Sequence, residues 1–156
     1  MKILKVLFIV AFTGILAFSV ANIASAEGRY GKVLDFQGSV EVKLGKASWT
    51  PAAKDIQLNQ GDMIRTQANS TATLEVENAG IVEIKPNSEL ELSELTSNKK
   101  DDSYRTILDL SLGEIFIKAK KLTADKSRFE VKTPTSVVGV RGTAFSVKVD
   151  TIPDAE

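Results

Sequence analysis

The chain has 156 residues, with 20 basic and 20 acidic side chains, and it contains neither histidine nor cysteine. The balanced charge excludes the basic stripe of a nucleic-acid-binding protein, and the lack of cysteine excludes disulfides and thiolate metal sites. Because the commonest general base and the best nucleophile are also missing, we predict a protein that is not an enzyme and carries no cofactor or metal.

The first 26 residues match a secretory signal peptide. Lys2 and Lys5 form a basic start, residues 6–21 are mostly apolar, and Ala24-Ser25-Ala26 fits the small-residue cleavage pattern. The apolar run is shorter than the roughly 20 residues of a membrane-spanning helix. We therefore predict cleavage and a periplasmic or secreted protein, with a retained membrane anchor as the alternative.

Cleavage would leave residues 27–156, which is enough for one compact domain. We expect that domain over residues 27–150 and a frayed tail over residues 151–156. Removal of Lys2 and Lys5 leaves 18 basic against 20 acidic side chains, so the mature chain has a net charge of −2.

From residue 31 onward apolar side chains recur at every second position, which is the period of a half-buried strand. Glycine, proline and asparagine residues that favour turns separate the alternating runs; Gly38, Gly45, Gly61, Gly80 and Gly113 are examples. Many short antiparallel strands without a helical stripe predict a single all-β domain, built as a sandwich, roll or partly closed barrel.

The segment 96–103 contains no apolar residue and predicts an exposed loop. Asp101, Asp102 and Ser103 lie within it, but they supply too few oxygens for calcium. The glutamates that alternate with apolar residues predict a solvated face of the sheet. Only two buried carboxyl groups in a deep cleft would restore a glycosidase-like activity.

Two places in the chain are candidate contact sites. Arg141 lies between Gly139 and Gly142 and is followed by Thr143, so its guanidinium is either held by an internal acid or turn, or offered to a partner carboxylate. The two glycines suit positive φ angles or a close backbone approach. Trp49, the only tryptophan, is expected in the core, with an interface anchor as the alternative.

Several blocks carry a family likeness, and the most specific is Val140-Arg141-Gly142-Thr143-Ala144-Phe145. The others lie at residues 38–42, 61–66, 70–76, 86–92, 112–115 and 129–134. With these blocks the chain resembles the FecR domain family of bacterial envelope proteins over most of residues 31–149. The resemblance implies an all-β, non-catalytic domain that faces the periplasm or the cell exterior.

In the best-known relatives, such a domain passes a signal from an outer-membrane siderophore receptor to a sigma factor. Only five residues precede the apolar run here, so we expect no sigma-factor binding. We expect an interaction module in envelope signalling or sensing, bound to an envelope protein or a cell-wall polymer and not to nucleic acid. The alternative is a structural or peptidoglycan-binding envelope protein.

Similar domains commonly continue past the equivalent of Val149 with a further hairpin. We therefore expect the final strand to keep an unpaired edge, which favours self-association through that edge.

Overall fold

A computed structural model of the chain describes residues 28–122 and 124–150. The strands of this part are β1 (Gly31–Gln37), β2 (Val40–Lys43), β3 (Thr50–Pro51), β4 (Gln57–Leu58), β5 (Met63–Thr66), β6 (Thr71–Val76), β7 (Gly80–Ile84), β8 (Ser88–Asn98), β9 (Ser103–Ala119), β10 (Arg128–Lys132), β11 (Val137–Val140) and β12 (Ala144–Val149). The predicted leader and tail lie outside the described residues. Within the described ranges, no helix is long and apolar enough to cross a membrane.

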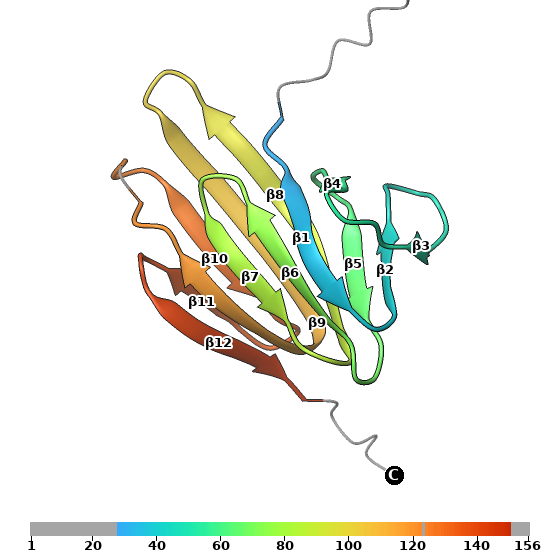
Figure 1. The fold of residues 1–156 in the computed structure, drawn as a ribbon. Coiled ribbons are helices and arrows are strands. Elements are labelled where there is room, and N and C mark those ends of the chain that lie inside the picture. Colours follow the sequence, from blue (N-terminus) through green and yellow to red (C-terminus); the bar gives the residue numbers. More distant parts are fainter. Residues whose placement is uncertain (1–27, 123, 151–156) are drawn as a thin grey trace, which may run out of the picture.

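The strands form one strongly curled sheet with the shape of a half-barrel (Figure 1). Its main path runs β3-β2-β5-β8-β9-β7-β6-β1-β4, and β10 and β12 both pair with β9 off this path. The predicted all-β fold is confirmed, in its partly closed form. Nearly all neighbours are antiparallel, as expected, but β9 and β10 are parallel.

Strand β9 is 17 residues long and joins the two halves of the sheet. Before Gly113 it pairs with β8 and β10, and from Gly113 onward it pairs with β7 and β12. Gly113 has a φ of 87°, and a Cβ there would lie 2.2 Å from the Oγ of Ser88. Glycine is therefore required where the strand changes partners. The expected turn at Gly113 is wrong, because the strand continues through it.

Alternate strand residues fill the inside of the curl with aliphatic side chains. The largest fully buried ones are Phe129, Leu58, Ile64, Leu74, Ile84, Leu90, Leu92, Leu108, Leu110, Ile115, Ile117 and Val33. Two residues of the predicted alternation stay outside this core: Leu44 is 41% exposed and Leu112 is 38% exposed. Leu44 lies just beyond the end of β2, and Leu112 lies where β9 changes partners, so neither faces the closed interior.

Half of the polar segment 96–103 is strand, so the predicted exposed loop is confined to a short turn. Its first residues end β8 and Ser103 begins β9, so the turn is confined to residues 99–102. Backbone pairing extends the hairpin into this polar segment, as between Ser97 and Tyr104. The Ser103 hydroxyl donates to Asp101 at 2.7 Å, and Lys126 pairs with the same carboxylate at 3.1 Å.

Arg29 ties the start of the described domain to three distant segments. Its guanidinium donates to the carbonyl oxygens of Thr96 at 3.2 Å and Arg105 at 3.0 Å, to that of Glu77, and to Oγ1 of Thr106 at 2.9 Å. Arg29 is only 5% exposed, and this burial lowers the pKa of its guanidinium. The N-terminal end of β1 is thus fixed to β8, β9 and the turn before β7.

Candidate functional site

The two margins of the sheet end in different ways. On one side the outermost strands are β3 and β4, each two residues long, and β3 contains Pro51. Short strands and proline prevent pairing at a sheet edge. On the other side the outermost strands are β11 and β12, four and six residues long and without proline. We call β11, β12 and the groove between them the open margin.

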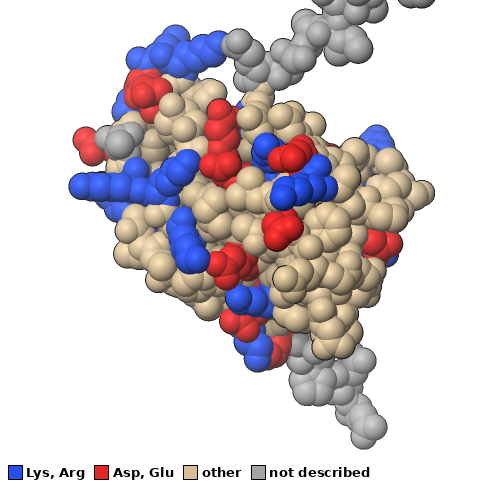
Figure 2. All heavy atoms as spheres, viewed as in Figure 1, with Lys and Arg blue, Asp and Glu red and all other residues tan. Residues whose placement is uncertain are grey.

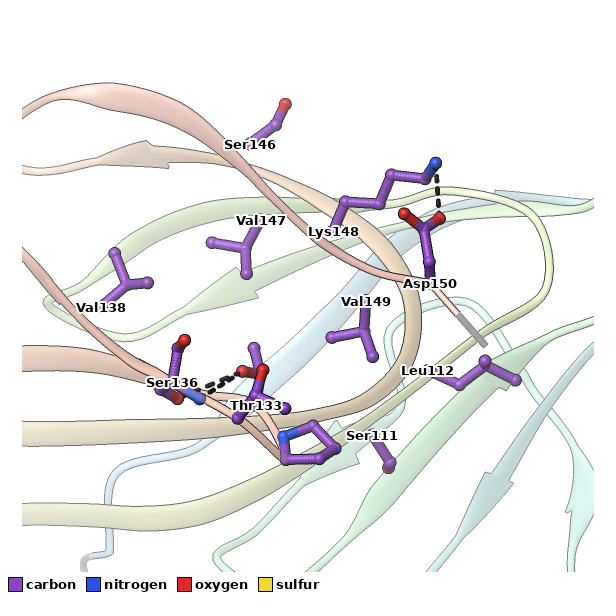
Figure 3. Close-up of a pocket in the computed structure, with 12 residues that line it drawn as sticks. Ser111, Leu112, Thr133, Ser136, Val138, Ser146, Val147, Lys148, Val149 and Asp150 are labelled. Atoms are coloured by element: carbon purple, nitrogen blue, oxygen red, sulfur yellow. Dashed lines mark hydrogen bonds and ion pairs between the residues drawn. The ribbon is translucent and has the colours of Figure 1, made fainter. Parts of the chain in front are cut away.

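The groove of the open margin has a volume of about 590 Å³. Figure 3 shows Val147 and Val149 on one side of β12 and Ser146 turned to the other side. The aliphatic lining residues are Leu112, Val138, Val147 and Val149, and the hydroxyl-bearing ones are Ser111, Thr133, Thr135, Ser136 and Ser146. The groove therefore offers an apolar surface edged with groups that donate and accept hydrogen bonds.

The outer edge of β12 has free hydrogen-bonding capacity. The N–H of Ala119 donates to the carbonyl of Thr143 at 3.1 Å. This hydrogen bond fixes which residues of β12 direct their backbone N–H and C=O groups toward β9. In an antiparallel pair, every second residue points its N–H and C=O away from the partner. On β12 these residues are Ala144, Ser146 and Lys148, and within the described residues no strand pairs with that edge.

The outer edge of β11 has the same property. The N–H of Thr133 donates to the carbonyl of Ser136 at 2.8 Å, and the β10–β11 register continues from this turn. By the same alternation, Val137 and Gly139 direct their backbone groups outward. Two strand edges that are ready for pairing therefore flank one groove.

The open margin carries little charge and exposes apolar side chains. Val137 is 63% exposed, although large aliphatic side chains are usually buried. The Nζ of Lys148 lies 2.6 Å from Oδ1 of Asp150, and this hydrogen bond raises the pKa of Lys148. The two charges neutralise each other at one end of the groove, so the groove itself suits an uncharged, extended ligand.

The predicted residues Gly139, Arg141, Gly142 and Thr143 lie together at the open margin, where they end β11 and lead into β12. Gly142 has a φ of 63°, which fits the expected role for glycine. Gly139 lies in a strand with open space around it and no positive φ, so that expectation is wrong for it. Among the described residues, no ion pair or side-chain hydrogen bond holds the exposed Arg141.

Trp49 is half-buried and is not a core residue, which corrects the prediction. Its ring stacks on the guanidinium of Arg65, whose Cζ lies 4.2 Å from a ring centroid. Trp49 directly precedes β3, at the margin opposite to β12 in the strand order. The structure therefore does not bring Trp49 together with the motif around Arg141.

Elsewhere in the described part of the chain, charged side chains are interspersed and many of them are paired. Figure 2 shows acidic and basic side chains interspersed over one face of the molecule. Many are in cross-strand pairs, such as Lys118 with Glu83 at 2.7 Å and Arg65 with Glu41 at 2.8 Å. In residues 28–122 and 124–150, no three acidic side chains converge in a way that could hold a metal ion.

Most residues that line the groove could not be predicted from the sequence. Leu112 was expected in the core as part of the alternating run, and Val138 and Ser146 had no distinguishing pattern. The only local signal was the absence of proline and the scarcity of charge along residues 137–149, which becomes meaningful once these strands are known to be outermost.

The fold and the open margin define a compact all-β domain with an unprotected sheet edge. The family model described as FecR protein matches residues 62–154, which is more than half of the chain. The chain therefore belongs to the FecR family, as the sequence motifs predict. No curated protein and no solved structure matches it.

Proposed function

We propose that this protein is a non-enzymatic interaction module of the bacterial envelope, and that it acts in signalling by binding an extended segment of another envelope protein. The segment would add as a strand to the open margin, where its backbone pairs with β12 or β11 and its side chains enter the groove. Recognition by strand addition obtains affinity from the main chain and specificity from pockets for alternate side chains.

The contrast between the two sheet margins carries this proposal. Edge strands are a hazard that proteins usually block, and β3 and β4 are blocked by their length and by Pro51. The outer edges of β11 and β12 are longer, carry no proline and lie beside an apolar groove. One margin is blocked and the other, within the described residues, is open. We infer that the open edge is a surface kept for a partner.

The groove also indicates the chemistry of the partner. Its aliphatic lining favours β-branched or other apolar side chains at alternate positions of the bound segment. The ion pair of Lys148 and Asp150 leaves no net charge in the lining of the groove to attract a strongly charged ligand. Membership in the FecR family and the leader-like residues 1–26 support an extracytoplasmic location for this encounter.

Site-specific photo-crosslinking in envelope extracts tests the proposal. A crosslinking amino acid replaces Val137 at the open margin in one variant, and it replaces Leu44, an exposed leucine beyond the end of β2, in the control. We expect one protein to be captured from position 137 and not from position 44. We also expect Val137→Lys to abolish its binding and Leu44→Lys to leave it intact.

Purified peptidoglycan in a parallel pull-down separates the glycan alternative. Retention on peptidoglycan with no crosslink from position 137 would overturn the protein-partner proposal. Equal capture from positions 137 and 44 would also refute it, because the open margin would then have no special role.

A further inference from the structure

The outer edge of β12 is complementary to itself in one antiparallel register. The backbone groups available for pairing belong to Ala144, Ser146 and Lys148, as the ladder with β9 requires. When two copies of β12 run antiparallel with Ser146 opposite Ser146, Ala144 of each copy faces Lys148 of the other. All three outward residues of both strands then pair, which gives about six backbone hydrogen bonds between the copies.

Neighbouring registers are worse for identifiable reasons. A shift by one residue on one strand brings an outward-pointing residue against one that already pairs with β9, so its hydrogen bonds are lost. A register centred on Lys148 places two ammonium groups opposite each other, which is destabilising. A register centred on Val147 leaves Ala144 without a partner inside β12. Only centring on Ser146 uses the whole edge.

Side chains on both faces fit the same register. The outer face of β12 carries Ala144, Ser146 and Lys148, which are exposed, so no bulky group meets its equivalent there. On the inner face, Phe145 of one copy lies opposite Val147 of the other. Phe145 and Val147 already belong to or pack against the core, so the pairing extends the apolar interior across the two copies.

The register also gives Arg141 an acidic neighbour. At the end of the paired strands, Asp150 of one copy lies opposite Gly142 of the other, next to Arg141. Within the described residues Arg141 has no ion pair, and Asp150 is bound by Lys148 at an exposed position. The two-fold symmetry repeats this contact, so each dimer brings Arg141 and Asp150 of opposite copies together twice.

We propose that the chain forms a two-fold symmetric dimer through antiparallel pairing of β12 with β12, centred on Ser146. The dimer goes beyond the proposed function, because it needs no other protein. It covers the β12 edge with a second copy, so a foreign strand and the second copy compete for that edge.

Charge substitutions at position 144 test the dimer and its register. Sedimentation equilibrium of the purified protein, with or without its leader, gives the dissociation constant of the dimer. Because Ala144 faces Lys148 of the other copy, we expect Ala144→Glu to tighten the dimer and Ala144→Lys to weaken it, each by roughly three- to ten-fold. Adding Lys148→Glu to Ala144→Lys should restore the dimer. Gln37→Glu and Gln37→Lys, on an exposed residue of β1, serve as charge-matched controls and should change nothing.

The proposal would be overturned if the chain stayed monomeric up to about 1 mM. It would also be overturned if both Ala144 variants shifted the dissociation constant in the same direction, or if Ser146→Glu tightened the dimer. The last result would indicate that position 146 faces Lys148, hence another register. The crosslink from position 137 is scored in a separate experiment, so the dimer and the proposed function can fail independently.

Discussion

The guanidinium of Arg65 lies over the ring of Trp49, with 4.2 Å between its Cζ and a ring centroid, while its Nε donates to Glu41 at 2.8 Å. One side chain thus connects the loop before β3 to β2 and β5. A cation held over an indole at a partly exposed site contributes about 0.5–1 kcal/mol. We expect Arg65→Ala to lower the free energy of unfolding by about 1 kcal/mol and to shift the tryptophan emission to the red. Urea titration followed by fluorescence measures both, and Lys46→Ala, at an exposed position, is the control.

Arg29 offers a stronger test of what holds the domain closed. Arg29→Met keeps the aliphatic stem but leaves three carbonyl oxygens and the Thr106 hydroxyl without their donor. Loss of a buried partner costs about 1–3 kcal/mol for each well-buried group. We expect a loss of about 2–4 kcal/mol in urea unfolding, with Arg29→Lys in between because an ammonium cannot reach all the acceptors. Arg128→Met, on an exposed arginine, should stay near wild type; an equal loss in both would exclude a specific role for Arg29.

Alanine substitutions at Gly113 and Gly45 distinguish the energetic cost of a strained backbone from the cost of steric overlap. Both have a positive φ, of 87° and 55°, but a Cβ at Gly113 would lie 2.5 Å from the carbonyl oxygen of Asn87, whereas a Cβ at Gly45 meets nothing within 4 Å. We expect Gly45→Ala to cost about 1 kcal/mol, from the left-handed backbone alone. Gly113→Ala should cost at least about 3 kcal/mol, because it forces β8 and β9 apart as well. Thermal unfolding of both variants checks this order.

The ion pairs of Glu83 make the stability of the domain depend on pH in the acid range. Hydrogen bonds from Lys118 and Lys85 hold the pKa of the Glu83 carboxyl below its usual value of 4.5. The unfolded chain therefore binds this proton more readily than the folded one, so Glu83 stabilises the fold above about pH 4.5 and the contribution disappears as pH falls through the lowered pKa. We expect Glu83→Gln to be less stable at pH 7 and to lose less stability on acidification. Urea midpoints between pH 3 and pH 7 measure the slope, and a slope equal to that of the wild type would contradict the prediction.

The strands could be predicted from the sequence because half-burial leaves a period of two in the side chains. The runs around Leu74, Leu90 and Ile115 are therefore found where they were expected. Segment 96–103 was predicted as a loop throughout because a hairpin tip is solvated on both faces and has no apolar period, although residues 96–98 and 103 pair across the hairpin. The parallel neighbours β9 and β10 left no local pattern at all, since pairing order depends on contacts between distant segments.

The candidate site could be predicted only in part. The unusual motif around Arg141 marked the right place, because glycine at a positive φ leaves a trace in the sequence, as at Gly142. The groove itself could not be found, since Val138 and Val147 look like any other strand valines until β11 and β12 are known to be outermost. Trp49 was misplaced because its cover is a single arginine from β5, and stacking of this kind has no sequence period.

The attachment of β12 by a single ladder has a mechanical consequence. Tension applied to the chain beyond residue 150 acts first on the pair of Val149 and Gly113, and then on each following pair in turn. Bonds loaded one after another yield at a lower force than bonds loaded together, so β12 would peel away while the other strands keep their partners. The C-terminal strand would then detach before the rest of the domain unfolds, and its detachment would expose the edge of β9 that pairs with β12.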